Sequence, residues 1–214
     1  MRAGAVIVAA GMSTRMKQFK QMMKIGNFTL AERVAINFKR AGIQDIVMVT
    51  GYHGRQLEAY LNYLDIEFVK NEQYEHTDML ESAKIGLYQL QNRCDKILFC
   101  PADIPFFTDE TVKAVLGQNA EIVVPRCGGK SGHPISIQNE MIPRILSYCG
   151  DEGLRGALKA TGIPIRYVEV DDLGSLMDAD TREDFEKLVT LHNKQRSRWS
   201  FPLKVEKQRE KELF

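Results

Sequence analysis

The sequence predicts a three-layer α/β domain with a mostly parallel, Rossmann-like sheet. Short runs rich in Val and Ile, the first at residues 5–10, are bounded by Gly and are typical of the buried strands of a parallel sheet. These runs alternate with amphipathic helical segments, a spacing that indicates βαβ units. In open sheets of this kind, ligands bind at the carboxyl ends of the strands. We therefore expect the functional residues in the loops that follow the strands.

Length and composition favour one domain over two. The chain has 214 residues, of which 44% are hydrophobic, and this is enough to form one sizeable core. A net charge of +1 argues neither for nor against nucleic acid, and we expect no nucleic-acid partner. No stretch is long enough to span a bilayer and no classical export signal is visible, so no membrane partner is expected. The four cysteines lack C-x-x-C spacing, which fits the reducing cytoplasm best.

The individual elements follow from apolar periodicity and from their terminal residues. Thr29 precedes an amphipathic helix, and Gly42 is placed for a left-handed cap at its end. Asp78 with Glu81 indicates a capping box at the start of a later helix. Further strands are expected at 46–49, 66–69, 97–100, 121–125, 135–137 and 166–170. Further helices are expected at 57–64, 78–90, 108–116 and 181–188.

The loop after the first strand has the composition of a phosphate-binding loop. Gly11 ends the strand and allows the backbone to approach a ligand, because it carries no Cβ. A polar, basic segment with Ser13, Arg15, Lys17 and Lys20 follows. The loop N–H groups, together with Arg15 and Lys20, favour a polyanion, and a nucleoside triphosphate is the one we expect. A merely solvated basic loop is the alternative interpretation.

Two common phosphate loops do not match this segment. The dinucleotide fingerprint needs further glycines after Gly11, where the sequence has Met12 and Ser13. A P-loop needs a Gly directly before its Lys, and Met16 stands before Lys17. The segment therefore belongs to neither class.

A second candidate loop follows the strand expected at 97–100. It reads Pro101-Ala102-Asp103-Ile104-Pro105, and the two prolines restrict the backbone on either side of the acid. The carboxylate of Asp103 would thus be held at the ligand edge of the sheet, where it offers the hard oxygen that Mg²⁺ prefers. Asp is also a common turn and cap residue, so a structural role is the alternative.

The first loop resembles the A-A-G-x-S-x-R-M-G-x-x-K signature of nucleotidyltransferases of the molybdenum-cofactor cytidylyltransferase family. It departs from that signature at Lys17, where Gly is usual. The P-x-D-x-P stretch around Asp103 is similar to the second signature of the family, and the resemblance covers about residues 4–190. The matching residues of the first loop are Ala9, Ala10, Gly11, Ser13, Arg15, Met16 and Lys20.

Two further stretches resemble the family at the nucleotide and the metal. The family pattern N…G-M-x-x-S-x-x-x-G-L approaches the nucleotide, and it is matched here except that Asp78 stands where Gly is usual. The family motif D-x-D-T-x-E-D is similar to residues 178–184, and it makes Asp180 the second metal ligand. Thr181 to Asp184 is also an ordinary helix start. The residues that match the nucleotide pattern are Asn71, Met79, Ser82, Gly86 and Leu87.

The acceptor side is indicated by two weaker similarities. Gly132-His133-Pro134 resembles a family G-H-P stretch, so His133 is a candidate contact of the acceptor; a His fixed beside a proline in a tight turn is the alternative. The stretch Gly150 to Arg155 is expected between helices and resembles G-D-x-G-x-R. Arg155 is therefore a candidate for the acceptor phosphate, and a salt-bridged helix arginine is its alternative.

The resemblance implies a complete site on a sheet of the nucleotide-diphospho-sugar transferase (GT-A-like) type. Arg15, Lys20 and Asp103 would be catalytic, and Asp103 with Asp180 would hold Mg²⁺. His133 and Arg155 would contact the acceptor. The residues implied in nucleotide binding are Ala9, Ala10, Gly11, Ser13, Arg15, Lys20, Gly51, Asn71, Ser82 and Asp103.

The implied reaction is attack by an acceptor phosphate on the α-phosphate of a nucleoside triphosphate, usually CTP, with release of pyrophosphate. The implied acceptor is molybdopterin, with or without molybdenum, and a molybdenum hydroxylase would receive the product. One alternative is another phosphorylated acceptor, such as a sugar 1-phosphate or phosphocholine. Another is a non-catalytic carrier or insertion chaperone for the cofactor.

The composition changes at the end of the chain. Residues 194–214 hold seven basic and three acidic residues and the only Trp. We expect a nucleotidyltransferase domain at 1–193 and a basic tail or linker at 194–214. A solvated tail, a linker to a further domain and a docking segment are the alternatives.

Overall fold

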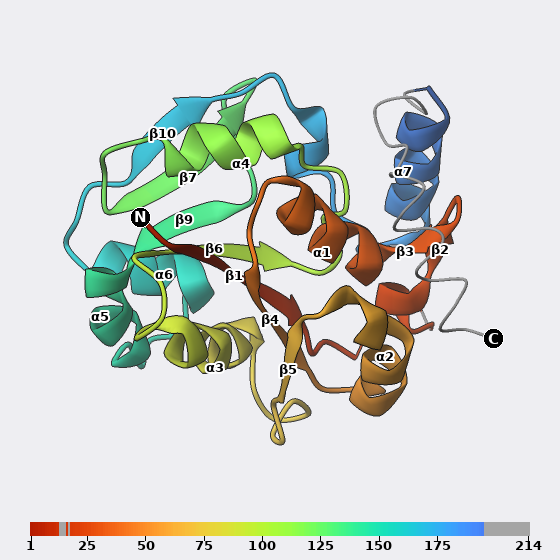
Figure 1. The fold of residues 1–214 in the computed structure, drawn as a ribbon, viewed down its shortest axis with the longest axis horizontal. Coiled ribbons are helices and arrows are strands. Elements are labelled where there is room, and N and C mark those ends of the chain that lie inside the picture. Colours follow the sequence, from red (N-terminus) through yellow and green to blue (C-terminus); the bar gives the residue numbers. More distant parts are fainter. Residues whose placement is uncertain (13–15, 17, 195–214) are drawn as a thin grey trace.

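The fold is organised around one eight-stranded sheet (Figure 1). The computed structural model describes residues 1–12, 16 and 18–194. The strand order is β10-β7-β9-β6-β1-β4-β5, with β8 paired to the carboxyl end of β7. The strands are β1 (Ala3–Ala9), β4 (Asp45–Thr50), β5 (Glu67–Lys70), β6 (Lys96–Pro101), β7 (Ile122–Cys127), β8 (Lys130–Ser131), β9 (Ile135–Gln138) and β10 (Arg166–Glu169).

The sheet is mostly parallel, as the sequence predicts. β1 lies between β4 and β6 and is parallel to both, with Val8 opposite Val49 on one side and Pro101 on the other. β9 runs antiparallel to β6 and β7. Because β1 and β6 are parallel neighbours, the loops that leave their carboxyl ends meet at one edge of the sheet.

Helices cover both faces of the sheet and complete the three layers (Figure 1). One face is covered by α1 (Leu30–Arg40), α2 (Gly54–Leu61) and α4 (Asp109–Leu116), and the other by α3 (Met79–Leu90), α5 (Ile142–Leu146) and α6 (Gly153–Ala160). The alternation of side chains along β1 divides it between these layers: Ile7 belongs to the core under α1, and Val6 to the core under α3. Buried on both faces, the central strands are continuous apolar runs.

The predicted helix ends are mostly confirmed. Thr29 caps α1 in a capping box with Glu32, and Gly42 follows at φ +88°. Two details differ. The apolar stripe at 57–64 is divided between α2 and a 3₁₀ turn, Asn62–Leu64. Asp78 accepts the Glu81 N–H as predicted, but the Glu81 carboxylate accepts from Lys84 at 2.7 Å instead of completing the capping box.

The last helix, α7 (Arg182–Lys194), stands beside the small hairpin of β2 (Lys24–Ile25) and β3 (Phe28–Thr29) (Figure 1). A third, smaller core joins these elements through buried Ile25, Phe106 and Leu188. Asp180 precedes α7 by two residues, so this packing brings its loop toward the carboxyl end of β6. The predicted domain boundary at 193/194 stays a prediction, because residues 195–214 lie outside the described residues.

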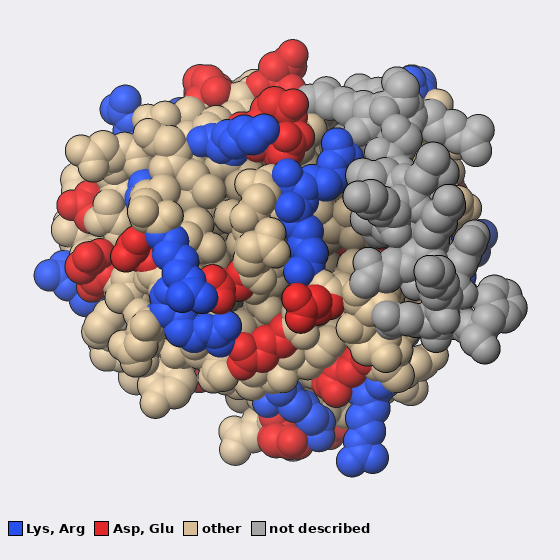
Figure 2. All heavy atoms as spheres, in the orientation of Figure 1, with Lys and Arg blue, Asp and Glu red and all other residues tan. Residues whose placement is uncertain are grey.

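Charge is distributed over the surface without one dominant sign. Basic and acidic side chains are interspersed over the described part of the face in Figure 2. Among residues 1–12, 16 and 18–194, no helix combines the length and the apolar character needed to cross a membrane.

Candidate active site

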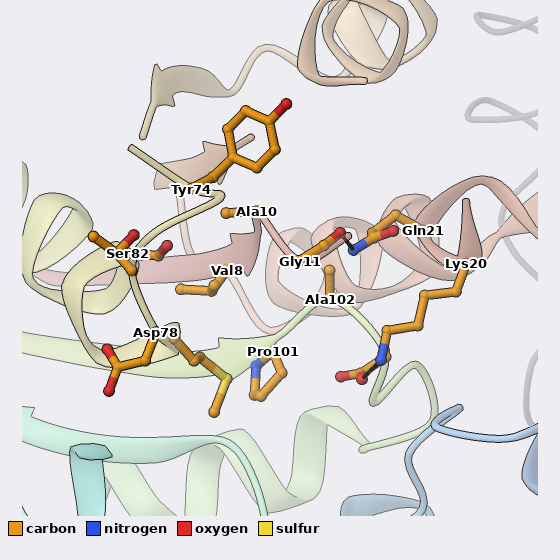
Figure 3. Close-up of a pocket in the computed structure, with 13 residues that line it drawn as sticks. Val8, Ala10, Gly11, Lys20, Gln21, Tyr74, Asp78, Ser82, Pro101 and Ala102 are labelled. Atoms are coloured by element: carbon orange, nitrogen blue, oxygen red, sulfur yellow. Dashed lines mark hydrogen bonds and ion pairs between the residues drawn. The ribbon is translucent and has the colours of Figure 1, made fainter. Parts of the chain in front are cut away.

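A pocket opens at the carboxyl ends of β1 and β6, where the fold brings three loops together (Figure 3). The first loop follows β1, the second follows β6, and the third runs from β5 into α3. The lining residues are Val8, Ala10, Gly11, Lys20, Gln21, Tyr74, Thr77, Asp78, Met79, Ser82, Pro101, Ala102 and Asp103.

Lys20 links two carboxylates that are far apart in the sequence. It begins a 3₁₀ turn, Lys20–Met22, and its ammonium donates to the Asp103 carboxylate and, at 3.0 Å, to Asp180 Oδ1. The side chains of Lys20 and Asp103 are each 14% exposed, and that of Asp180 is 30% exposed. Burial alone would lower the pKa of Lys20, but the charges and hydrogen bonds of the two aspartates outweigh it and raise the pKa. The ammonium therefore stays charged at neutral pH.

The two carboxylates fit a hard divalent cation. Both reach one ammonium nitrogen, so their oxygens lie close enough to share a single cation. Burial raises the pKa of the neighbouring Asp178, and the charges of Asp180 and Asp103 raise it further. In the part of the chain that the structure describes, no group of three or more His, Cys, Asp or Glu could hold a metal. A pair of carboxylates can hold a hard divalent cation such as Mg²⁺, whose remaining ligands are then substrate phosphates and water.

The turn after β1 is held by a side chain that the sequence did not single out. Gln21 is buried, and its Nε2 donates to the Gly11 carbonyl at 3.2 Å (Figure 3). Gly51, after β4, lies against the same turn: a Cβ there would be 2.6 Å from the Ala10 carbonyl oxygen and 2.7 Å from Tyr74 Cβ. Gly51 thus permits a close approach of three backbone segments.

Asn71 organises the third loop from behind the pocket. It is buried, and its Nδ2 donates to Thr77 Oγ1 at 2.9 Å and to Ser82 Oγ at 3.0 Å. Its Oδ1 accepts the Gln73 N–H at 3.0 Å. Asn71 therefore positions Thr77 and Ser82, which line the pocket.

The structure brings together most of the predicted nucleotide-binding residues. Asp180 does not line the pocket but accepts a hydrogen bond from the pocket-lining Lys20. Ser13, Arg15 and Lys17 lie outside the described residues. Those that line the pocket are Ala10, Gly11, Lys20, Ser82 and Asp103, and those packed behind it are Ala9, Gly51 and Asn71. Residues that the motifs missed are Gln21, Tyr74 and Thr77; buried or partly buried polar residues in loops have no periodic signal in a sequence.

The two candidate acceptor residues are placed differently. His133 is half-buried; its backbone N–H donates to the Ser175 carbonyl at 2.9 Å, and its Nδ1 lies 3.5 Å from the Phe99 carbonyl. Arg155 is exposed within α6 and not between helices, because Leu154 and Ala157 pack into the core and draw this stretch into the helix. Both acceptor roles stay predictions.

Comparison with known proteins decides the family. A family model described as a MobA-like NTP transferase domain matches residues 5–166. The chain belongs to this family. The matched range includes the pocket-lining residues and Asp103, while Asp180 lies beyond it. As a MobA-like NTP transferase, the chain is a nucleotidyltransferase.

Relatives of the MobA-like domain include cytidylyltransferases. The chain is 27% identical over 183 residues to the molybdenum cofactor cytidylyltransferase of Escherichia coli K12, covering 84% of this chain and 92% of that protein. It is 30% identical over 129 residues to the CTP:phosphoglutamine cytidylyltransferase of Campylobacter jejuni, covering 56% of this chain and 51% of that protein.

Solved structures share the fold. The Mycobacterium tuberculosis protein Rv0371c superposes with a TM-score of 0.78 at 22% identity, over 89% of this chain and 98% of that one. A nucleotidyl transferase from Methanothermobacter superposes with a TM-score of 0.80 at 18% identity, over 90% of this chain and 98% of that one. The MobA-like chain thus has the nucleotide-diphospho-sugar transferase type of sheet predicted for it.

Proposed function

We propose that this protein transfers CMP from CTP to the phosphate of a molybdopterin-type acceptor, with release of pyrophosphate, and that it depends on Mg²⁺. The observation that carries this proposal is the convergence of Lys20, Asp103 and Asp180 beside a pocket at the carboxyl ends of β1 and β6. The choice of CTP and molybdopterin is supported by the similarity to the molybdenum cofactor cytidylyltransferase of Escherichia coli along 92% of that protein.

The nucleotide would lie across the turn that Gln21 holds. Backbone N–H groups of residues 10–13, together with Arg15 and Lys20, would bind the triphosphate, because oriented N–H dipoles and cations favour an anion. Ser82, whose hydroxyl Asn71 positions, would contact the nucleoside side.

The chain's own residues would act by positioning and by neutralising charge. A phosphate monoester is already anionic at neutral pH, so its oxygen needs no general base to attack the α-phosphate in line. Asp103 and Asp180 would hold the Mg²⁺, which supplies neutralisation of the phosphate charge when bound. A divalent metal is also supported by a second solved structure of Rv0371c, in complex with manganese, which superposes on this chain with a TM-score of 0.72.

The setting we propose is the cytoplasm, with a molybdenum hydroxylase as the recipient of the dinucleotide cofactor. All four cysteines are free, which favours a reducing compartment. A second candidate function keeps CTP but uses another phosphorylated acceptor, and the 30% identity to CTP:phosphoglutamine cytidylyltransferase favours it.

The test measures pyrophosphate release with molybdopterin and Mg²⁺, offering CTP, GTP and ATP separately. We expect release with CTP and a loss of about a hundredfold or more in kcat/KM for Asp103→Asn, because the site loses a metal ligand. Asp95→Asn is the matched control: Asp95 is exposed and precedes the opposite end of β6.

If none of the three nucleotides gives pyrophosphate release, the assignment of molybdopterin as the acceptor is contradicted. Phosphorylated acceptors, beginning with amide and sugar phosphates, would then be offered with CTP. Failure with every acceptor, while CTP still binds, would favour the non-catalytic carrier.

A further inference from the structure

We propose that Lys20 is an internal stand-in for the divalent metal. In the metal-free protein its ammonium occupies the position between Asp103 and Asp180, and it must leave before a divalent ion enters. The nucleotide draws it away, so metal and nucleotide bind together and not metal first. This inference rests on the proposed function, because it takes these two aspartates as the metal ligands.

The contacts show one cation serving both carboxylates. Lys20 Nζ donates to Asp103 Oδ2 and, at 3.0 Å, to Asp180 Oδ1. Figure 3 shows the extended side chain of Lys20 in the pocket. These oxygens are hard donors of the kind that Mg²⁺ binds. An ammonium in hydrogen-bond contact with both occupies the lone pairs and the space that the ion needs.

Burial explains why a cation is needed there at all. Asp103 is only 14% exposed, and a part-buried carboxylate beside a second one is costly unless a positive charge compensates it. Lys20 supplies that charge when no metal is bound. Once a metal is bound, the like charges of the ammonium and the ion repel at short range.

The Lys20 ammonium can also reach a second anionic group, the proposed triphosphate. Its side chain lines the same pocket as Gly11, across which the triphosphate is proposed to lie. A lysine ammonium sits on a flexible four-carbon stem and binds phosphate as a point charge. Rotation of that stem moves the charge from the carboxylates to the phosphates and opens the metal position in the same movement.

The carboxylates do not depend on Lys20 alone for their placement. The Ala179 N–H donates to the Asp103 carbonyl at 3.1 Å, which ties the loop before α7 to the loop after β6. A variant without the ammonium should therefore keep both acids at the pocket. This makes Lys20→Met a usable test.

The experiment titrates the full-length, metal-free protein with Mn²⁺ in the absence of nucleotide, following free Mn²⁺ by electron paramagnetic resonance. We expect Lys20→Met to bind Mn²⁺ at least about tenfold more tightly than wild type, because a competing positive charge is gone. Lys24→Met is the matched control for loss of one charge, since Lys24 is exposed in β2, and it should bind as wild type does. Equal or weaker binding by Lys20→Met would overturn the proposal.

A second measurement applies if Lys20→Met is less stable than wild type, because it compares each protein with and without Mn²⁺. Mn²⁺ should raise the thermal midpoint of Lys20→Met more than that of wild type, because only in the variant are the carboxylates without their ammonium. Equal shifts would count against the competition.

Adding Asp103→Asn distinguishes failure of the stand-in role of Lys20 from failure of the proposed metal site. In the Lys20→Met background, Asp103→Asn should abolish the tighter Mn²⁺ binding. If it does not, the aspartates are not the metal site, and the proposed function loses its metal assignment as well. If Mn²⁺ binding depends on Asp103 but is the same with and without Lys20, only the stand-in role is wrong.

Discussion

His133 shows at the residue scale how burial decides the charge of a group near the site. Removal from solvent lowers its pKa, and the contact with the Phe99 carbonyl and the charge of Asp103 oppose this without outweighing it. Its imidazole is therefore neutral at pH 7 in the folded protein. A neutral imidazole is compatible with the proposed reaction, in which the acceptor phosphate is already an anion.

The lowered pKa predicts a pH-dependent stability. Between about pH 6.5, where a histidine of the unfolded chain titrates, and the lower folded pKa, the unfolded state binds more protons. Stability therefore falls as the pH falls through this window. We expect His133→Gln to lose less thermal stability than wild type between about pH 7.5 and about pH 5.5. Melting curves at both pH values test this, with His76→Gln as the control. If His133→Gln loses as much thermal stability between the two pH values as wild type does, the prediction is wrong.

At the scale of elements, the approach of α3 to the sheet depends on Gly86. A Cβ at this position would be 2.4 Å from Val6 Cγ1 and 3.0 Å from Val49 Cγ2. The helix thus lies directly on β1 and β4. Its first turn presents Met79 and Ser82 to the pocket, so the packing of the helix and the shape of the site are linked.

Gly86→Ala is expected to destabilise the fold by about 1–3 kcal/mol through overpacking, which exceeds the ~1 kcal/mol that alanine adds in helix propensity. The displaced helix should also raise KM for CTP. Urea unfolding and steady-state kinetics measure the two effects. Tyr88→Ala, on the same helix at a side chain 63% exposed, should change stability by no more than about 0.5 kcal/mol. If Gly86→Ala is as stable as wild type, α3 can shift away from the sheet without cost and the prediction is wrong.

At the scale of the whole molecule, the cysteines report how the three layers exclude solvent. Cys100 lies in the middle of the sheet on β6 and is fully buried, and burial raises the pKa of its thiol well above the ordinary range. Burial also raises the pKa of the Cys94 thiol. Cys149 is exposed, and Cys127 is half-buried.

Thiol labelling of the native protein should therefore separate two classes. Cys149 is expected to react first, followed by Cys127, whereas Cys94 and Cys100 should react only as the fold opens. Mass spectrometry after timed labelling with a maleimide measures this, and Cys149→Ser should remove the first phase. Early labelling of Cys100 would show that the sheet opens without global unfolding.

Local patterns in the sequence were enough to predict the fold class and the two loops that follow β1 and β6. Apolar runs buried on both faces indicate parallel strands without any knowledge of their neighbours, because the signal is local. The same holds for the Thr29 cap of α1 and for Asp103 at the end of β6, since the loop composition carries the signal.

The family resemblance implied that Asp103 and Asp180 share one metal site, whereas the contact of Lys20 with both acids is seen only in the assembled fold. Lys20, Asp103 and Asp180 converge because β1 and β6 are neighbours and because α7 packs on the β2–β3 hairpin. Asn71 became a support for Ser82 and not a pocket-lining residue. These outcomes depend on pairings across the whole chain, and no local pattern of residues encodes where a side chain ends in space.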